Sequence, residues 1–342
     1  MIALAPAPRL VASALMLALS PQEVREFLPG SLYLELRTLG DAFGEFDPTV
    51  ATAAEFAERL HAENPEVLVT GWRTPALPAV LPPRLRYVCH LTGTVRPLLT
   101  HRHLEDGLLV TNWGASIARV VAEGALFHIL ACLRRGPHWA LVMHQEQGWK
   151  TPDSENASLF GRRVGLHGFG RIAQELVRLL APFGVPITVV APDVDAAVEQ
   201  AYGIKKTATL DQLFSENDVV VELAPLTAQT EGAVTERHLR LLRPGAVFVN
   251  TGRGRVVDEA GLVKVAREGK VLFGLDVFAV EPLAKDHPLR GLRNVNLTPH
   301  LSGPTTDRRR DAGAHALRNL RAYVAGQPLD AVVTPDLYLT SS

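Results

Sequence analysis

The run Arg163-Val-Gly-Leu-His-Gly-Phe-Gly-Arg-Ile-Ala173 decides the fold of this chain. Apolar residues alternate up to His167, and a glycine turn then leads into a helix-forming run. A strand that turns into a helix through Gly-x-Gly-x-x-Ala is typical of dinucleotide binding. Gly168 permits the sharp turn, Gly170 lets a pyrophosphate approach the backbone, and Ala173 allows the helix to pack closely on the strand. The free N–H groups of the helix start are predicted to hold the phosphates.

The motif alone leaves the function open, because a glycine turn between strand and helix is useful in any α/β fold. The 342 residues suit two domains, and a hydrophobic fraction of 47% supports sizeable cores. A formal charge of −1 with a pI near 6.9 argues against nucleic acid or an anionic membrane as the main partner. The two cysteines, Cys89 and Cys132, have no C-x-x-C spacing. We therefore expect neither a disulfide framework nor a metal site, and a cytoplasmic location.

Residues 10–19 are apolar enough to suggest a signal peptide or a buried first element. Only Arg9 precedes this run as a charge, there is no A-x-A-like cleavage site, and Ser20-Pro-Gln-Glu then resembles a helix start. These features favour the buried element. No run approaches the length of a membrane span.

The first third alternates between strands and helices. Strands are predicted at residues 32–36, 66–70, 85–91 and 108–111, and helices at 52–63 and 97–104. Alternation of this kind indicates a parallel sheet covered by helices. The run from Ser116 to Arg134 predicts a long helix that is apolar nearly all round. Such a helix is buried on more than one side, so we expect it to cross between domains and to contribute to a homodimer.

A second alternating series begins at Arg163. Strands are predicted at 164–167, 187–191, 218–223, 246–250, 271–275 and 295–298, with helices at 172–183, 210–214, 235–242 and 259–268. A final basic helix at 305–326 is expected to return to the first domain. The predicted fold is α/β, with two doubly wound parallel-sheet domains: a Rossmann dinucleotide-binding domain (112–303) inserted into a flavodoxin-like substrate domain (1–111 and 304–342).

Ligands of such sheets lie at the carboxyl ends of the strands. Three consecutive predicted strands of the second series are followed by Arg253, Glu281 and His300. Arginine can hold a substrate carboxylate or carbonyl oxygen, histidine can donate a proton to a developing alkoxide, and glutamate can orient the imidazole and stabilise its charged form. Each residue alone has a plainer interpretation, as a surface arginine, a turn cap or a loop histidine. Their joint occurrence at one sheet edge favours hydride transfer to a 2-keto acid.

The sequence resembles the D-isomer-specific 2-hydroxyacid dehydrogenases. The matching segments are Gly-Leu-Leu-Val-Thr-Asn-Trp-Gly (107–114), Val-Ala-Glu (121–123), the glycine turn (168–173), Ala-Pro-Leu-Thr (224–227), Val-Asn-Thr-Gly-Arg-Gly-Arg-Val-Val-Asp (249–258), Leu-Asp-Val-Phe-Ala-Val-Glu-Pro (275–282) and Thr-Pro-His (298–300). The resemblance covers about residues 85–306. It implies that Arg253, Glu281 and His300 are the catalytic triad, and that Asp276 contacts the nicotinamide carboxamide.

The resemblance also implies a substrate loop at residues 91–95, whose backbone N–H groups would bind the substrate carboxylate. The substrate residues expected there are Thr92, Gly93, Thr94 and Arg96. Arg96 stands where the family often has an acidic residue, so it is either a solvated surface arginine or a reader of a second anionic group. The expected cofactor residues are Gly168, Phe169, Gly170, Arg171, Ile172, Asp193, Ala224, Pro225, Thr230, Thr251, Gly252, Asp276, Ser302 and Gly303.

Two departures bear on the cofactor. The glycine motif ends in Ala173 instead of glycine, and the acidic residue expected after the second strand falls on Ala191. Asp193 follows two positions later and is expected to replace it. Residues 191–200 contain no Arg or Lys, so a 2′-phosphate lacks a partner there. NAD is therefore favoured over NADP, with Arg171 or another distant cation as the alternative partner.

The functional prediction is an oxidoreductase acting on a small 2-keto or D-2-hydroxy acid. The rival from another class is an NAD(H)-sensing, corepressor-like binding protein on the same fold. Formate dehydrogenase is disfavoured, because it expects glutamine at the position of Glu281. No nucleic acid or membrane partner is expected.

Overall fold

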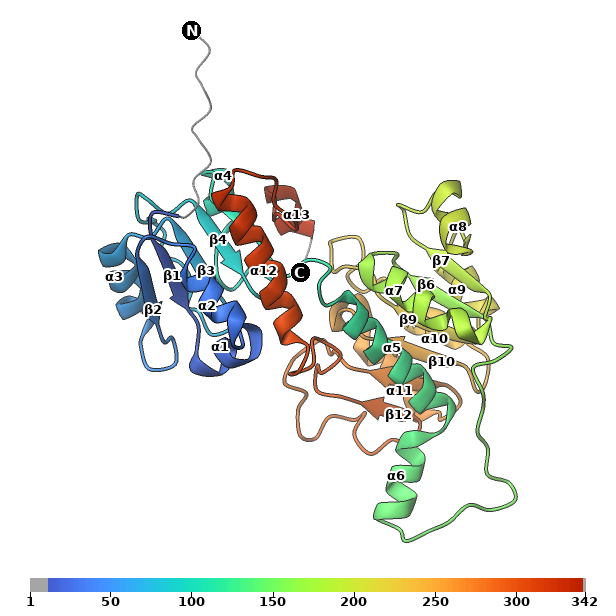
Figure 1. Cartoon of the computed structure of the whole chain (residues 1–342). Helices are drawn as coiled ribbons and strands as arrows, with labels where there is room; N and C mark the ends of the chain where they lie inside the picture. Colours follow the sequence, from blue (N-terminus) through green and yellow to red (C-terminus); the bar gives the residue numbers. More distant parts are fainter. Residues whose placement is uncertain (1–11, 341–342) are drawn as a thin grey trace. The chain divides into compact units, whose positions relative to one another are not determined.

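The computed structural model describes residues 12–340, with the side chain of Thr340 left out. Its contacts divide the chain into two compact units (Figure 1). The first unit comprises residues 1–117 and 305–342, and the second comprises 118–304. The predicted boundaries after residues 111 and 303 stay a prediction. No helix of the described residues is long and apolar enough to cross a bilayer.

The first unit contains a five-stranded parallel sheet in the order β2-β1-β3-β4-β5. This is the flavodoxin-like order. Its strands are β1 (Leu15–Ala18), β2 (Phe43–Phe46), β3 (Val67–Thr70), β4 (Tyr87–His90) and β5 (Leu109–Thr111). Its helices are α1 (Pro21–Phe27), α2 (Ser31–Arg37), α3 (Ala53–Glu63), α4 (His101–Glu105), α12 (Arg309–Val324) and α13 (Pro335–Thr340).

The buried first element is confirmed from residue 15, because all four residues of β1 are buried and β1 lies between β2 and β3 in the sheet. Leu10 of that predicted run lies outside the described residues. The helix start at Ser20 is also confirmed, since its hydroxyl accepts a hydrogen bond from the Glu23 N–H and the Glu23 carboxylate returns one to Ser20. The prediction of a strand at residues 32–36 is wrong.

That segment is α2, and the second strand of the unit is β2 instead. The reason is visible in the burial: Leu36 is buried, whereas Leu34 is 64% exposed. Leucine is a good helix former, and the apolar residues at positions 32 and 36 share one helix face. Alternation over five residues therefore did not distinguish a strand from a two-turn helix.

The second unit contains a seven-stranded parallel sheet in the order β12-β11-β10-β9-β6-β7-β8. Renumbered within the unit, this is the Rossmann order 3-2-1-4-5-6 with one strand added. The strands are β6 (Val164–His167), β7 (Ile187–Val190), β8 (Lys205–Lys206), β9 (Val219–Glu222), β10 (Val247–Asn250), β11 (Leu272–Leu275) and β12 (Val295–Leu297). The predicted fold class of two doubly wound domains is thus confirmed.

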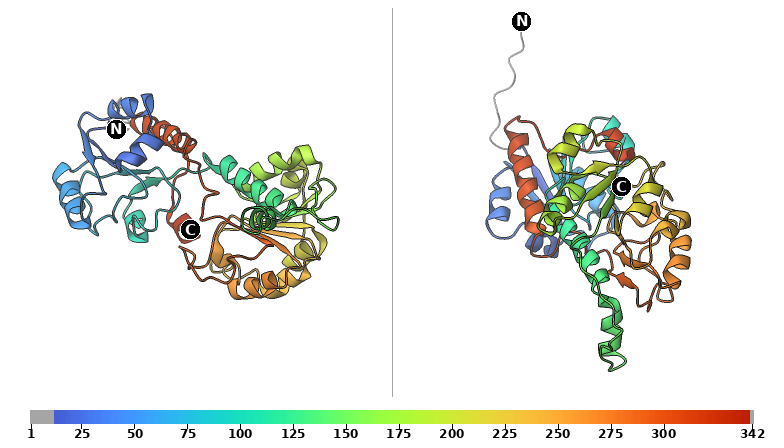
Figure 2. Two further views of the ribbon diagram at one scale, coloured as in Figure 1. Left: turned by 90° about the horizontal axis from the view of Figure 1, so that it is seen from below. Right: turned by 90° about the vertical axis from the view of Figure 1, so that its right-hand side faces the viewer.

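Six strands were predicted for this sheet, and β8 is the strand that the prediction lacked. It is two residues long, exposed and basic, so it carries no hydrophobic pattern. The helices of the unit are α5 (Ala118–Leu133), α6 (Gly136–His144), α7 (Arg171–Leu180), α8 (Ala196–Tyr202), α9 (Leu210–Glu216), α10 (Glu236–Leu241) and α11 (Glu259–Arg267), with 3₁₀ turns η1 (Ala181–Phe183) and η2 (Gly254–Val256). Figure 2 shows the green helices α5 and α7 on one face of the sheet and the orange helices α10 and α11 on the other.

Two apolar clusters of the second unit lie on opposite faces of its sheet. One joins α5 and α7 to Val164, Leu166 and Val189. The other joins α9, α10 and α11 to Val220 and Phe248. Because successive strand residues point to opposite faces, β9 and β10 each contribute to both clusters. Both faces are therefore covered, as an all-parallel sheet requires.

Candidate active site

His300 and Glu281 are in direct contact at the carboxyl edge of the second sheet. The His300 Nδ1 atom lies 2.7 Å from Glu281 Oε2, and the other carboxylate oxygen accepts a hydrogen bond from the Phe278 N–H at 3.0 Å. The His300 side chain is 51% exposed. The carboxylate thus fixes the imidazole through Nδ1 and leaves Nε2 as the ring atom for a substrate.

The backbone of His300 is held in the left-handed region, at φ 55°. This conformation is uncommon for a residue with a side chain, and it concentrates at functional sites. The buried Asp276 maintains it: its carbonyl oxygen accepts from the His300 N–H at 2.9 Å, and its carboxylate accepts from the N–H groups of Leu301 and Ser302 at 2.7 and 2.9 Å. Asp276 therefore organises the histidine loop, a role that the sequence did not indicate.

His128 on α5 extends this network and was not singled out from the sequence. Its Nδ1 atom accepts from the Asn296 side-chain amide at 3.0 Å, and its Nε2 atom lies 2.9 Å from Thr298 Oγ1. Thr298 in turn donates to Asp276 at 2.5 Å. Burial lowers the pKa of His128 to about 4, so the ring is neutral and can donate through Nε2. A lone histidine in an apolar helix carries no sequence signal for this role.

Arg253 follows β10 on the same edge of the sheet, since β10, β11 and β12 are neighbours. Asn250 clamps its backbone: the Asn250 amide donates to the Arg253 carbonyl at 3.1 Å and accepts from the Gly252 N–H at 3.0 Å. The next residue, Gly254, packs so closely that an added Cβ would lie 2.0 Å from the carbonyl carbon of Phe278. Only glycine fits this contact, which ties the arginine turn to the segment before Glu281.

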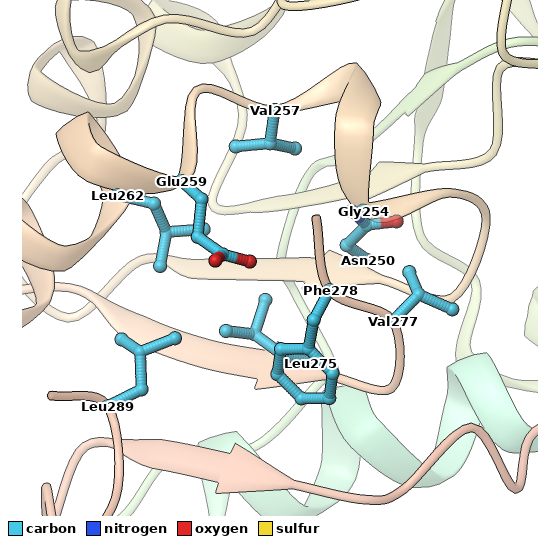
Figure 3. Close-up of a pocket in the computed structure, with 9 residues that line it drawn as sticks. All are labelled: Asn250, Gly254, Val257, Glu259, Leu262, Leu275, Val277, Phe278 and Leu289. Carbon is cyan, nitrogen blue, oxygen red and sulfur yellow. The ribbon is translucent and has the colours of Figure 1, made fainter. Parts of the chain in front are cut away.

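A pocket of about 290 Å³ opens beside the histidine. It lies among Phe278, Glu281, Arg290, Thr298 and His300, together with apolar neighbours. Figure 3 shows a second and much smaller pocket beside Gly254, of about 10 Å³, where the Glu259 carboxylate is surrounded mainly by apolar side chains. The small pocket has room for about one water molecule, so of these two pockets only the larger can take a substrate.

The glycine turn has the geometry that a pyrophosphate requires. Gly168 has φ 88°, and a Cβ there would lie 2.8 Å from the Ala224 backbone. Gly170 is the N-cap of α7, and a Cβ at Gly170 or Gly303 would meet nothing within 4 Å. Open space therefore lies in front of the helix start, where the first N–H groups have no partner within the helix. Phe169, Arg171 and Ile172 belong to this turn and the first turn of α7.

The loops after β9 and β10 contain five further predicted cofactor residues: Ala224, Pro225, Thr230, Thr251 and Gly252. Thr230 closes its own loop, because its hydroxyl accepts from the Thr227 N–H at 2.8 Å and donates to the Pro225 carbonyl at 2.5 Å. Thr251 differs: its buried hydroxyl has no hydrogen-bond partner anywhere in the part of the chain that the structure describes. An unpaired buried hydroxyl at the carboxyl end of a Rossmann strand is suited to a bound dinucleotide. The donor set and the open glycine turn thus fit such a cofactor.

A cation from a neighbouring strand reaches the loop after β7, and the sequence of the loop did not predict it. Asp193 is exposed, and Asp195 caps α8 by accepting from the Val198 N–H at 2.9 Å. Lys206 of the neighbouring strand β8 reaches into the loop, where its Nζ donates to the carbonyls of Pro192 and Val194 at 3.2 and 2.7 Å. The positive charge absent from residues 191–200 is therefore supplied by the next strand.

In the first unit, Thr92, Gly93 and Thr94 follow β4. Their backbone N–H groups donate to no oxygen of residues 12–340. Three consecutive free donors make a suitable site for a carboxylate. His90 fixes the loop from below: its ring nitrogens lie 2.9 Å from Thr70 Oγ1 and 2.6 Å from Thr92 Oγ1, and burial lowers its pKa to about 4.

Arg96 is exposed, and its guanidinium makes hydrogen bonds within the first unit. Its guanidinium donates to the carbonyl of Tyr338 at 3.1 and 3.2 Å and to that of Leu339 at 3.1 Å. These are carbonyls of the last turn of α13, where a positive charge is favourable. Arg96 thus fastens α13 to the substrate loop, and this structural role accounts for its charge.

The structure brings Arg253, Glu281 and His300 to one edge of one sheet, together with the cofactor turn. The substrate loop belongs to the first unit. The second unit is a dinucleotide-binding domain that carries a carboxylate–histidine pair. This combination defines the class of protein.

Residues 126–302 match the profile of the D-isomer specific 2-hydroxyacid dehydrogenase, NAD binding domain. The D-3-phosphoglycerate dehydrogenase of Mycobacterium tuberculosis is 36% identical over 222 residues, which is 65% of this chain and 42% of that protein. The chain thus spans about two fifths of that relative's length. The glyoxylate reductase of Aeropyrum pernix is 32% identical over 252 residues, or 72% of this chain and 75% of that protein.

Among solved structures, a glyoxylate/hydroxypyruvate reductase from Sinorhizobium meliloti, described as NADPH-dependent, superposes with a TM-score of 0.73 at 24% identity. The match covers 94% of this chain and 98% of that one, and it supports the fold. The chain belongs to the D-isomer-specific 2-hydroxyacid dehydrogenase family.

Proposed function

We propose that this protein is an NAD(H)-dependent enzyme that interconverts a small 2-keto acid and the corresponding D-2-hydroxy acid. The observation that carries the proposal is the 2.7 Å hydrogen bond between His300 and Glu281, on the same sheet edge as Arg253. Family membership supports the proposal, since the relatives are named as dehydrogenases and reductases of this kind. In this view the second unit holds the cofactor and the first supplies the substrate loop.

When bound, the reduced nicotinamide supplies the hydride that forms the new C–H bond at the keto carbon and is itself oxidised. The residues of the chain manage charge and proton. Arg253 holds the carboxylate or carbonyl oxygen with its planar fork. As the C=O π electrons move onto oxygen, His300 gives that oxygen its Nε2 proton, and the hydroxyl of the product forms. Glu281 holds the ring in place and stabilises the imidazolium that precedes the transfer.

The cofactor assignment is NAD in preference to NADP. It rests on the exposed carboxylate of Asp193 and on the acidic neighbours Asp195 and Glu199, which would repel a 2′-phosphate. Lys206 is the cation that could instead favour NADP by binding a 2′-phosphate. Its ammonium group, however, already donates to two backbone carbonyls. Solved structures of the same fold include one described as NADPH-dependent and one described as an NAD-complexed form, so the fold by itself does not decide between the two cofactors.

Assembly and location form a further part of the proposal. Phe127 on α5 is 52% exposed, and Trp149 in the segment after α6 is 71% exposed. Large exposed apolar side chains of this kind suit a homodimer contact through the α5 region. The buried thiols of Cys89 and Cys132 suit a reducing compartment such as the cytoplasm. Sedimentation of the parent and of Phe127→Glu tests the dimer: the variant should sediment as a monomer.

The deciding experiment is a turnover assay over a panel of 2-keto acids with NADH and with NADPH. The enzyme proposal expects reduction of at least one acid and a loss of turnover in His300→Ala. Tight NADH binding without turnover of any acid would instead support the corepressor-like sensor. Because the sensor needs binding but no proton donor, His300→Ala separates the two functions.

A further inference from the structure

Two tryptophans flank the substrate loop on the first sheet. Trp72 follows β3 and Trp113 follows β5, while the loop follows β4, which lies between these strands. All three strands are parallel, so the two indoles and the loop share the carboxyl edge of the sheet. No sequence pattern predicted a role for either tryptophan.

Trp113 is built against the loop. The backbone N–H of Trp113 donates to the Thr92 carbonyl at 3.2 Å, and the side-chain amide of the neighbouring Asn112 donates to the Gly93 carbonyl at 2.9 Å. The indole covers Gly93 so closely that an added Cβ would lie 2.8 Å from Cζ2 and 2.9 Å from Nε1. Glycine at this position therefore lets the aromatic ring lie directly on the loop whose N–H groups are free.

Trp72 continues this aromatic surface. Its ring meets Trp113 edge to face, with centroids 6.0 Å apart at 84°, and it meets Phe27 at 5.3 Å. The guanidinium of Arg309 lies 4.9 Å from its centroid and is paired with Glu26. Trp72 is thus held on three sides and yet remains 48% exposed. Fixed indoles offer contact area at low entropic cost, which is typical of binding residues.

We propose that Trp72 and Trp113 form the subsite for the side chain of the keto acid, and that the preferred substrate is a 2-keto acid with an aromatic side chain. This inference rests on the proposed function and specifies its substrate class. The loop N–H groups hold the carboxylate, so the side chain on the next carbon lies beside the loop, where the indoles are. Arg96, which could have read a second anionic group, is engaged by α13. The surroundings of the loop therefore favour a π system over a second carboxylate or a phosphate.

The test compares kcat/KM for phenylpyruvate and for glyoxylate, which has no side chain, with NADH and the full chain. We expect the parent to prefer phenylpyruvate by about tenfold or more, as one well-filled apolar pocket permits. Trp72→Ala should lower this ratio by about tenfold. Phe160→Ala is the matched control, because Phe160 is also an exposed aromatic residue but lies in the second unit, and it should leave the ratio unchanged.

Binding provides an independent measurement. Calorimetry with NAD⁺ present compares phenyl-D-lactate with glycolate, and Trp72→Ala should weaken only the first. Binding of the aromatic acid without turnover would keep the subsite and overturn the proposed function. Equal kcat/KM for both substrates, or an equal fall of both in Trp72→Ala, would overturn the subsite and leave the function standing. Absence of both binding and turnover would overturn both.

Discussion

His167 and Glu222 form a buried pair inside the sheet of the second unit, where the two residues are register partners on β6 and β9. The His167 Nδ1 atom lies 2.5 Å from Glu222 Oε2, and Glu222 Oε1 accepts from the Ala224 N–H at 2.8 Å. Glu222 is fully buried. The pair therefore ties the residue before the glycine turn to the loop after β9, and both segments belong to the cofactor site.

The pair should show strong coupling in a double-mutant cycle. Glu222→Leu alone leaves a buried imidazole without its partner and should cost about 3–5 kcal/mol of unfolding free energy. The double variant His167→Val/Glu222→Leu should lie near the parent or above it, since apolar replacement of a buried pair is neutral or stabilising by about 1–4 kcal/mol. Urea unfolding measures both. Additive losses would show that the two side chains do not interact.

The same pair predicts a pH dependence. Burial lowers the pKa of His167, but the charge and the hydrogen bond of Glu222 outweigh it, and the pKa is raised. A raised folded pKa gives stability that is complete below the unfolded value of about 6.5 and is lost as pH rises through the folded value. His238 on α10 interacts with His167, and burial lowers its pKa, so it titrates on the acid side. Thermal melts above pH 6.5 should therefore fall more steeply in the parent than in the double variant.

Much of the second unit could be predicted from its sequence, because its signals are local. The glycine turn and the residues after three consecutive strands identify the sheet edge without knowledge of packing. His128 could not be found this way, since its partners Asn296 and Thr298 are about 170 residues away in the chain. The cation Lys206 was missed for a similar reason: it enters the loop after β7 from a neighbouring strand.

The first unit was harder to predict. The run at residues 32–36 has apolar residues that fit either a strand or a short helix, and packing decided for the helix α2. The sequence left open that Arg96 binds a second anionic group of the substrate. In the structure its guanidinium donates to backbone carbonyls more than 240 residues later in the chain. Contacts between residues so far apart in the chain cannot be predicted from the local sequence pattern.

Removing the proton donor should abolish most turnover. His300→Ala is expected to lower kcat by about 10²–10⁴-fold, the usual contribution of a positioned acid or base. The NADH dissociation constant should stay close to that of the parent, because the ring contacts Glu281 and not the glycine turn. Glu281→Gln keeps the shape, removes the charge and should lower kcat by about tenfold or more. Unchanged kcat in His300→Ala would exclude His300 as the acid.

Cofactor preference is tested by titrating nicotinamide fluorescence with the parent and two lysine variants. NADH should bind clearly more tightly than NADPH. Lys206→Ala should leave this preference unchanged, and Lys205→Ala, on the same short strand, is the matched control. Tighter binding of NADPH that disappears in Lys206→Ala would reverse the assignment and make Lys206 the partner of the 2′-phosphate.

Gly254→Ala should damage both folding and catalysis. The added methyl group would lie 2.0 Å from a backbone carbon of Phe278, so the arginine turn must move. We expect a loss of about 1–3 kcal/mol in unfolding free energy and a fall of about 10²-fold in kcat/KM, since an ångström of misplacement has that effect. Arg255→Ala, on the same turn but exposed and paired at the surface, should change neither by much.

The discontinuity of the first unit has a consequence for synthesis on the ribosome. Its sheet is complete by β5, but α12, which packs on α1, α2 and β4, begins only at Arg309. At Gly313 the helix approaches so closely that an added Cβ would lie 1.7 Å from the Phe27 carbonyl oxygen. A chain synthesised as far as residue 304 therefore holds the sequence of the second unit but still lacks a helix of the first. The first unit can complete its fold only after α12 has been made.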